Sequence, residues 1–164
     1  MPQKKDVKYL IIHHTGTSRD RTKFEALRAS YNWVITADGV LNESRPQDIV
    51  GAHARADGMN YKSLGIALTG NFMNELPTEA QIITLKGIIE AVRKIYNIPI
   101  ENVLGHNEVK GASTLCPGIN LLPIIKQIRS GKDIKKVNDQ LEITRSELKV
   151  ANEKLYQIDR IIHS

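Results

Sequence analysis

The chain has 164 residues, 41% of them hydrophobic and 25% charged, which is the composition of a globular protein that can bury a real core. Its formal net charge of +5 favours a polyanionic partner, yet the sequence contains no recognisable nucleic-acid-binding motif. A single cysteine excludes an internal disulfide, and the apolar runs near the start are too short for a signal peptide or a membrane span.

Strands are the main elements predicted in the first half of the chain. Residues 7–15 contain an apolar, partly β-branched run after a charged start, which predicts a buried strand. A short helix is predicted over residues 22–30. Residues 32–44 form two alternating segments joined by Asp-Gly, which predicts a β-hairpin. Residues 63–72 predict a further strand that ends at a Gly-Asn pair.

Helices are the main elements predicted in the second half. The segment 78–96 begins with a Thr-x-x-Gln capping box at Thr78 and carries apolar residues at helical spacing, so it is the clearest helix in the sequence. A short strand is predicted over residues 100–106. A second helix is predicted over residues 119–130.

The tail of the chain has a different pattern. Apolar residues recur at the a and d positions of heptads, and neither glycine nor proline follows Gly131. This predicts two domains, residues 1–130 as the globular domain and residues 131–164 as a C-terminal helix that can form a coiled coil. The a positions are Ile134, Leu141, Leu148, Leu155 and Ile162.

Two arrangements of this tail stay open. The heptad seam can join copies of the chain into a homo-oligomer. Alternatively the helix folds back on its own domain, because Ile143, Val150 and Ile161 widen the apolar stripe in the way a docked helix needs.

The histidines and the lone cysteine can form a metal site. His13 or His14 ends the first predicted strand, His106 follows another, and Cys116 stands in a loop before Pro-Gly. Imidazole and thiolate suit zinc, and a catalytic zinc site needs three protein ligands and an open position. From spacing alone, Cys116 can equally be a small buried hydrophobe or a nucleophile paired with a histidine, and each histidine can be a hydrogen-bonded polar residue.

Several motifs occur in the order seen in the zinc N-acetylmuramoyl-L-alanine amidases: YLIIHHT, YNWVITADG, AHA, NYKSLGIALTGNF and GHNEV followed by TLCPG. The sequence resembles this family, which includes amidase-type phage lysozymes and peptidoglycan recognition proteins, over residues 7–128 but not over the tail. The resemblance implies an α/β fold, with a central mixed β-sheet flanked by helices and a site in a cleft at one face. The heptad-patterned C-terminal helix is additional to that fold.

The resemblance also implies a role for each matching residue. His13, His106 and Cys116 match the family's three zinc ligands, so zinc (Zn2+) is the expected cofactor. Tyr31 matches the catalytic tyrosine. Thr114 matches a second catalytic position, which is often lysine in phage relatives and is threonine in amidase-active recognition proteins.

Two further positions match the substrate cleft, and two neighbours of the predicted metal ligands are expected to have structural roles. His53 matches a cleft histidine that faces substrate, and Asn32 stands where a histidine is common. His14 is expected to face away from the metal, because neighbours on a strand point to opposite sides. Glu108 is expected to brace its loop rather than act as a general base.

The function implied is hydrolysis of the amide bond between N-acetylmuramic acid and the first L-alanine of the stem peptide. The expected partner is peptidoglycan, with no nucleic acid and no membrane insertion, and a homo-oligomer can form through the C-terminal helix. The cysteine argues for an enzyme, since non-catalytic recognition proteins of the family typically lack it. Because no export signal is visible, we expect synthesis in the cytoplasm and, for a phage-type endolysin, access to the wall after holin-type release.

Three other functions stay open. A cytoplasmic enzyme that recycles wall fragments would also need no export signal. A non-catalytic peptidoglycan-binding module would bind the same polymer without turnover. A cysteine peptidase would use Cys116 as its nucleophile and would keep its activity in the presence of a chelator.

Overall fold

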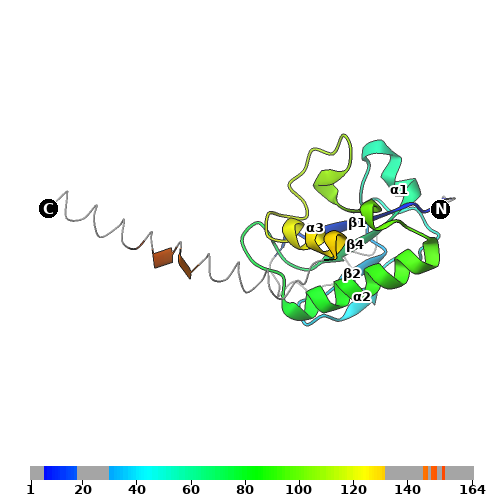
Figure 1. Cartoon of the computed structure of the whole chain (residues 1–164). Coiled ribbons are helices and arrows are strands. Elements are labelled where there is room, and N and C mark those ends of the chain that lie inside the picture. The colour runs from blue at the N-terminus through cyan, green and yellow to red at the C-terminus, as the bar shows by residue number, and fades with distance from the viewer. Residues whose placement is uncertain (1–5, 18–29, 132–145, 148, 151–152, 154–164) are drawn as a thin grey trace. The chain divides into compact units, whose positions relative to one another are not determined.

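The computed structural model describes residues 6–17, 30–131, 146–147, 149–150 and 153 (Figure 1). The chain divides into two compact units, Met1–Ser130 and Gly131–Ser164. Apart from Ser30, the short helix predicted over residues 22–30 lies outside the described residues, as do the a positions of the heptads.

A mixed five-stranded sheet forms the centre of the first unit, in the strand order β3-β2-β4-β1-β5. The strands are β1 (Tyr9–His14), β2 (Trp33–Ile35), β3 (Leu41–Glu43), β4 (Ser63–Leu68) and β5 (Val103–Gly105). Neighbouring strands run parallel from β2 through β4 and β1 to β5, and β3 alone pairs antiparallel, with β2. The mixed sheet and the strands predicted over residues 7–15, 32–44, 63–72 and 100–106 are therefore confirmed.

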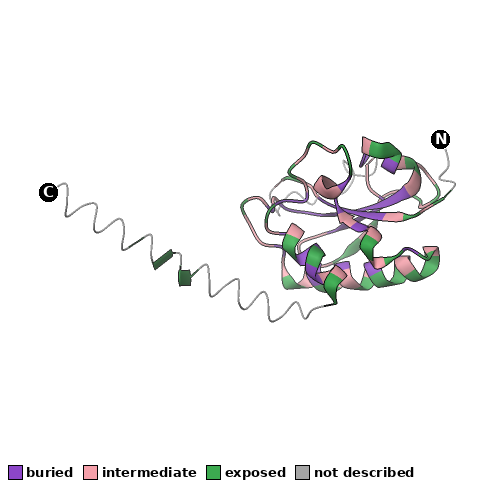
Figure 2. Cartoon of the chain, turned by 45° about the horizontal axis from the view of Figure 1, so that its top comes forward, coloured by how far each residue is buried: buried purple, intermediate pink, exposed green. Residues whose placement is uncertain are grey.

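The two inner strands are buried on both faces. Every residue of β4 is buried, and so are residues 10–13 of β1 (Figure 2). Parallel strands covered on both sides read as continuous apolar runs rather than as alternating ones, which explains the sequence of both segments. On one face of β1, Ile11 packs with Ala54, Met59 and Val109. This face, which His13 shares with Ile11, is the one that carries the site.

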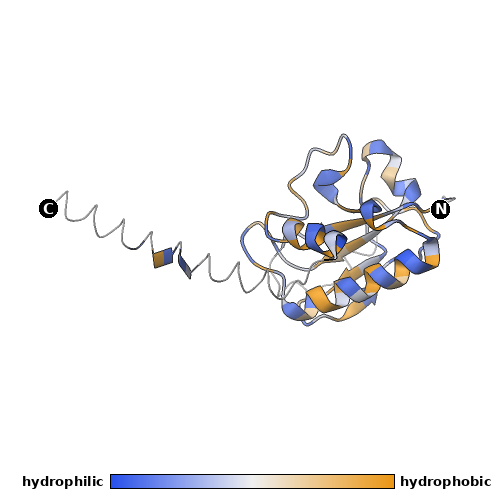
Figure 3. Cartoon of the chain, in the orientation of Figure 1, coloured by the Kyte–Doolittle hydropathy of each residue, from blue (hydrophilic) through white to orange (hydrophobic). Residues whose placement is uncertain are grey.

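The helices are α1 (Met59–Lys62), α2 (Glu79–Tyr96) and α3 (Leu122–Ser130). The predicted capping box is confirmed: Gln81 N–H donates to Thr78 Oγ1 at 3.1 Å, and Thr78 N–H donates to Gln81 Oε1 at 3.1 Å. The buried Gln81 amide also donates to the carbonyls of Ile35 and Thr69, so the start of α2 is tied to the ends of β2 and β4. Figure 3 shows hydrophobic and hydrophilic residues along α2, whose buried side faces the sheet.

The hairpin turn between β2 and β3 is formed as its sequence predicts. Gly39 adopts φ 85°, and its N–H donates to the Thr36 carbonyl at 2.8 Å. A Cβ at this position would lie 2.9 Å from Ala80 Cβ, so glycine is required both by the backbone conformation and by the close approach of α2.

The second unit is described at Gly131, an exposed turn residue, and at five exposed helical positions, Ser146, Glu147, Lys149, Val150 and Glu153. The heptad seam and its use remain predictions. Throughout the described part of the chain, no helix combines the length and the apolar content that a membrane crossing requires.

Candidate functional site

The register between β1 and β5 brings two histidines together. In this parallel pair Ile12 lies opposite Gly105, and the next residue of each chain segment is a histidine, His13 or His106. Their ring centroids are 4.6 Å apart. The two side chains therefore meet where adjacent parallel strands end, which is the edge at which open α/β sheets place their ligands.

The loop after His106 returns Cys116 to the same place. Asn107 N–H donates to the Cys116 carbonyl at 2.8 Å, which joins the two ends of this loop. Cys116 Sγ lies 3.6 Å from His13 Nδ1. One ligand atom each from His13, His106 and Cys116 can be chosen so that all three lie within 4.8 Å of one another.

The turn after Cys116 is packed against a different segment of the domain. Gly118 has φ 97°, and a Cβ there would lie 2.6 Å from the carbonyl carbon and oxygen of Phe72. Asn120 N–H also donates to the Phe72 carbonyl at 3.0 Å. The Pro-Gly pair after the cysteine therefore fixes the sulfur by seating its turn on the Phe72 backbone.

The three residues have the electrostatics of a zinc ligand set. Burial lowers the pKa of His13 well below its usual range, and His53 and His106 lower it further. Burial also lowers the pKa of His106, so both imidazoles keep a lone pair at neutral pH. Burial raises the pKa of Cys116 to about 11, so the metal-free protein holds a thiol that a divalent cation would deprotonate. Two neutral imidazoles and a thiol therefore fit zinc.

Tyr31 stands beside this group. Its ring centroid lies 5.0 Å from that of His13. Burial, and to a lesser degree the neighbouring Cys116, raise the pKa of Tyr31 to about 12. The phenol therefore stays protonated at neutral pH and can donate a hydrogen bond.

A cleft of about 590 Å³ opens next to the three residues. Its wall includes His106 and Thr114 as well as His53. The Thr114 hydroxyl accepts a hydrogen bond from Cys116 N–H at 3.1 Å, and a hydroxyl that accepts one bond can still donate its proton. The remaining lining residues are Ala52, Arg55, Ala56, Gly111, Ala112 and Ser113.

The two predicted substrate contacts are both buried. His53 lines the cleft but is only 6% exposed, and its ring contacts His13. Asn32 has no exposed surface, accepts a hydrogen bond from Gly65 N–H at 3.0 Å and donates to the Pro46 carbonyl at 3.1 Å. Asn32 thus joins β4 to the segment after the hairpin, and this position does not favour the predicted contact with substrate.

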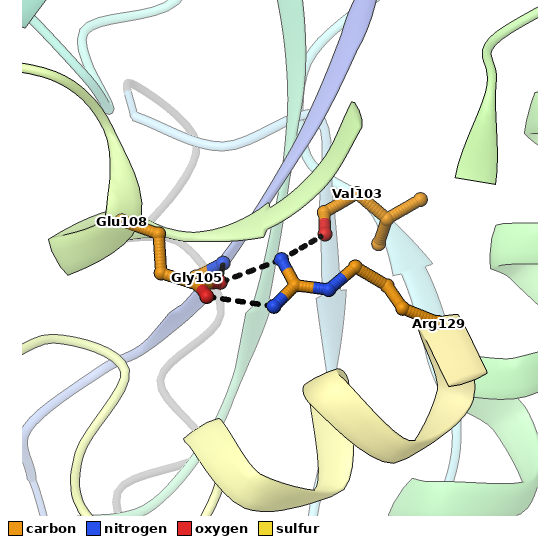
Figure 4. A network of polar contacts seen from close by, with 4 residues as sticks. All are labelled: Val103, Gly105, Glu108 and Arg129. Atoms are coloured by element: carbon orange, nitrogen blue, oxygen red, sulfur yellow. Dashed lines mark hydrogen bonds and ion pairs between the residues drawn. The ribbon is translucent and has the colours of Figure 1, made fainter. Parts of the chain in front are cut away.

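Glu108 braces the turn that carries His106, as expected from the sequence (Figure 4). Its carboxylate accepts from Gly105 N–H at 2.8 Å and forms a two-pronged ion pair with Arg129, at 2.7 and 2.9 Å. Arg129 also donates to the Val103 carbonyl at 3.0 Å. The last turn of α3 is therefore joined to both ends of β5, next to a predicted metal ligand.

His14 occupies the other face of β1, as strand geometry predicts. Its Nδ1 accepts a hydrogen bond from Phe72 N–H at 3.2 Å, on the side of the strand away from His53. Arg55, Ser63 and Arg129 also belong to this region, although no sequence pattern indicates them. A basic residue in a last helical turn, or a serine at a strand start, gives no signal of its own, because their partners are distant in sequence.

Comparison with known proteins gives a consistent set of similarities. The family model described as N-acetylmuramoyl-L-alanine amidase matches residues 3–119. Peptidoglycan-recognition protein SC2 of Drosophila melanogaster is 32% identical over 131 residues, which cover 69% of each protein. The endolysin N-acetylmuramoyl-L-alanine amidase LysCS from Clostridium intestinale superposes with a TM-score of 0.66 at 26% identity, covering 78% of this chain and 88% of that one. Peptidoglycan recognition protein-LE superposes with a TM-score of 0.65 at 27% identity, covering 76% of this chain and 82% of that one. It was solved in complex with tracheal cytotoxin, a monomeric diaminopimelic acid-type peptidoglycan.

Proposed function

Because the chain belongs to the N-acetylmuramoyl-L-alanine amidase family, we propose that it hydrolyses the amide bond between N-acetylmuramic acid and the first L-alanine of the peptidoglycan stem peptide, with zinc as its cofactor. The observation that carries this proposal is the meeting of His13, His106 and Cys116 at the end of two parallel strands, next to the cleft and a protonated tyrosine.

Zinc bound by these three residues would supply a Lewis acid that activates water and polarises the amide carbonyl. The two neutral imidazoles and the thiolate cancel only one of its two charges, so the ligand set preserves that acidity. Tyr31, whose ring lies beside that of His13, would donate a hydrogen bond to the oxyanion that develops on the carbonyl oxygen. Thr114, which lines the cleft, would orient the attacking water or the intermediate through its hydroxyl.

A non-catalytic binding module is the first alternative. Peptidoglycan recognition proteins are among the relatives, and a binder needs only the cleft. The complete set of three ligands favours an enzyme, since binding alone gives no reason to gather two imidazoles and a thiol at one point.

A cysteine peptidase is the second alternative. A nucleophilic cysteine needs a thiolate, which a neighbouring imidazolium or another positive charge stabilises. Here burial raises the pKa of Cys116 to about 11, and the pKa of its neighbour His13 lies well below the usual range, so neither partner is charged at neutral pH. This environment suits a metal ligand better than a nucleophile.

We assign the enzyme a lytic role as a phage-type endolysin, made in the cytoplasm and admitted to the wall after holin-type release. The similarity to an endolysin amidase supports this role, and the net charge of +5 suits an anionic wall polymer. A wall-recycling enzyme is the alternative. Expression in a host with and without a pore-forming partner would distinguish them, because an endolysin lyses cells only when it can cross the membrane.

Zinc dependence can be tested on purified sacculi with the full chain. We expect one zinc per chain by elemental analysis, loss of turnover after chelation, and recovery when zinc is restored. Activity that survives complete chelation would support the cysteine peptidase, and binding to sacculi without turnover would support the non-catalytic module.

Replacement of Cys116 by serine tests the ligand set itself. A serine hydroxyl is a poor zinc ligand, so Cys116→Ser should weaken zinc binding and abolish turnover. The matched control is His14→Asn, which changes a neighbour of His13 on the opposite face and keeps an acceptor for Phe72 N–H. Full turnover by a zinc-free Cys116→Ser protein would refute the proposal.

A further inference from the structure

A chain of hydrogen bonds leads from His13 away from the metal centre into the core. His13 Nε2 lies 3.1 Å from His53 Nδ1, and His53 Nε2 lies 3.4 Å from Ser63 Oγ. The Ser63 hydroxyl donates in turn to the Met59 carbonyl at 2.6 Å. All four residues are buried, with His13 1%, His53 6%, Ser63 0% and Met59 3% exposed. The chain therefore connects the first residue of α1 to a predicted metal ligand without passing through solvent.

The carbonyl at the inner end determines the direction of every bond in this chain. A carbonyl oxygen only accepts, so the single proton of the Ser63 hydroxyl points to Met59. Toward His53 the hydroxyl can then only accept, so His53 carries its proton on Nε2. In its neutral form the His53 imidazole has one N–H, which leaves Nδ1 as an acceptor facing His13.

The consequence for His13 follows directly. Its Nε2 must carry the proton that it donates to His53, so its Nδ1 is bare. This is the nitrogen that lies 3.6 Å from Cys116 Sγ. The chain thus selects the tautomer whose lone pair is on the nitrogen nearest Cys116.

The imidazole of His53 is held in place by its surroundings. A Cβ on Gly65 would lie 2.8 Å from His53 Cγ, so only glycine on β4 leaves room for the ring. The Asn60 side chain accepts from the backbone N–H groups of His53 and Ala54, at 3.0 and 2.8 Å. Backbone and ring are therefore both fixed with Nδ1 directed at His13.

We propose that His53 and Ser63 are positioning residues that set the tautomer and ring orientation of His13 for metal binding. This gives His53 a role inside the protein in addition to the predicted contact with substrate, since its ring also lines the cleft. The proposal rests on the proposed function in taking the metal to be zinc, whereas the tautomer itself is a property of the metal-free chain. Partners that orient metal-binding histidines in this way are common in zinc sites.

The tautomer can be read directly from the metal-free full chain. Nitrogen-15 chemical shifts and long-range couplings to the ring carbon protons distinguish a protonated nitrogen from a bare one in each imidazole. We expect His13 to be protonated at Nε2 and bare at Nδ1, and His53 to be protonated at Nε2. A His13 ring protonated at Nδ1 would overturn the proposal, whether or not the protein binds zinc.

Zinc affinity provides the second readout, measured by competition with a chromophoric chelator. Loss of such a partner costs on the order of 10- to 100-fold in metal affinity, and we expect this weakening in both Ser63→Ala and His53→Ala. His53→Asn should recover part of the affinity, because its side-chain oxygen can stand near the position of Nδ1 and accept from His13.

Thr69→Val is the matched control for the serine variant. Thr69 is 1% exposed and its hydroxyl donates to the Ile35 carbonyl at 3.4 Å, so this change also removes a buried hydroxyl bonded to a backbone carbonyl, but not one in contact with His53. Its zinc affinity should equal that of the unchanged chain. Unchanged affinity in Ser63→Ala and His53→Ala would overturn the positioning role and leave the proposed function standing. A chain that binds no zinc at all would instead refute the proposed function.

Discussion

At the scale of single residues, burial decides what each side chain of the site can do. The same loss of water that lowers the pKa of His13 raises those of Tyr31 and Cys116, because each group is held in its uncharged form. A zinc hydrolase needs these uncharged states: an imidazole with a lone pair, a protonated phenol, and a thiol that loses its proton when it binds the metal.

Tyr31→Phe tests the role of the phenol. The ring packs beside His13 and the change removes only the hydroxyl, so zinc binding and folding should be preserved. Loss of one oxyanion donor costs on the order of 100- to 1,000-fold in rate, and we expect a fall in kcat of this size. Steady-state kinetics on a soluble muropeptide would measure it, and an unchanged kcat would reduce Tyr31 to a packing residue.

At the scale of elements, the ion pair between Glu108 and Arg129 connects α3 to the turn that carries His106. The side chains are 20% and 19% exposed, so they are shielded from water more than a surface pair is. Arg129 comes from the last turn of the final helix of the domain, and Glu108 from the 3₁₀ helix His106–Glu108. The helix thus supports the turn that carries His106.

Arg129→Met removes the charge and leaves the Glu108 carboxylate without this partner. Removing the charged partner of a partly buried group costs about 1–3 kcal/mol of stability, so the free energy of unfolding should fall by that amount. Urea denaturation of the metal-free protein would measure the change. Lys8→Met is the matched control, since Lys8 pairs with Asp6 where both side chains are largely exposed, and it should have little effect. Equal effects of the two variants would contradict the bracing role.

The elements that could be predicted from the sequence are those whose defining residues lie close together in the chain. The capping box at Thr78 and the Asp-Gly turn before Val40 involve partners within four residues, and the structure forms both. The order of the strands could not be derived in this way, because it depends on pairing between distant segments. The family resemblance supplied the mixed sheet instead, and the structure confirms it.

Prediction of the site was limited in the same way. Residue chemistry suggested a set of histidines with Cys116, and the resemblance selected His13 over His14. The bonds of Ser63 to His53 and of Arg129 to Glu108 cross 10 and 21 residues and follow no repeat, so nothing in the sequence indicated them. The motif places Asn32 at the substrate cleft, and the sequence gives no indication that its amide also bonds to the backbone of Gly65 and Pro46.

For the molecule as a whole, the remaining prediction is that the C-terminal tail joins copies of the chain. The heptads from Ile134 to Ile162 predict a helix of about 45 Å at ~1.5 Å per residue, long enough to form a seam with another copy. Several linked sites would raise the avidity of the enzyme for a polymeric wall.

Light scattering on the full chain and on a shortened chain ending at Ser130 tests this prediction. We expect an oligomer for the full chain and a monomer for the shortened one. Leu148→Glu, at an a position, should dissociate the oligomer, whereas Glu147→Gln, one residue away, should not. A full chain that is monomeric at micromolar concentration would contradict self-association and favour a helix docked on its own domain.

The proposed function depends on which bond the protein cuts, and mass spectrometry of digested peptidoglycan identifies that bond. Purified sacculi treated with the zinc-loaded full chain should release stem peptides that begin with a free L-alanine amine, and should leave glycan strands whose muramic acid carries a free lactyl carboxylate. The Cys116→Ser protein should release neither. Products cut within the glycan or within the peptide, with the bond between muramic acid and L-alanine intact, would contradict the account.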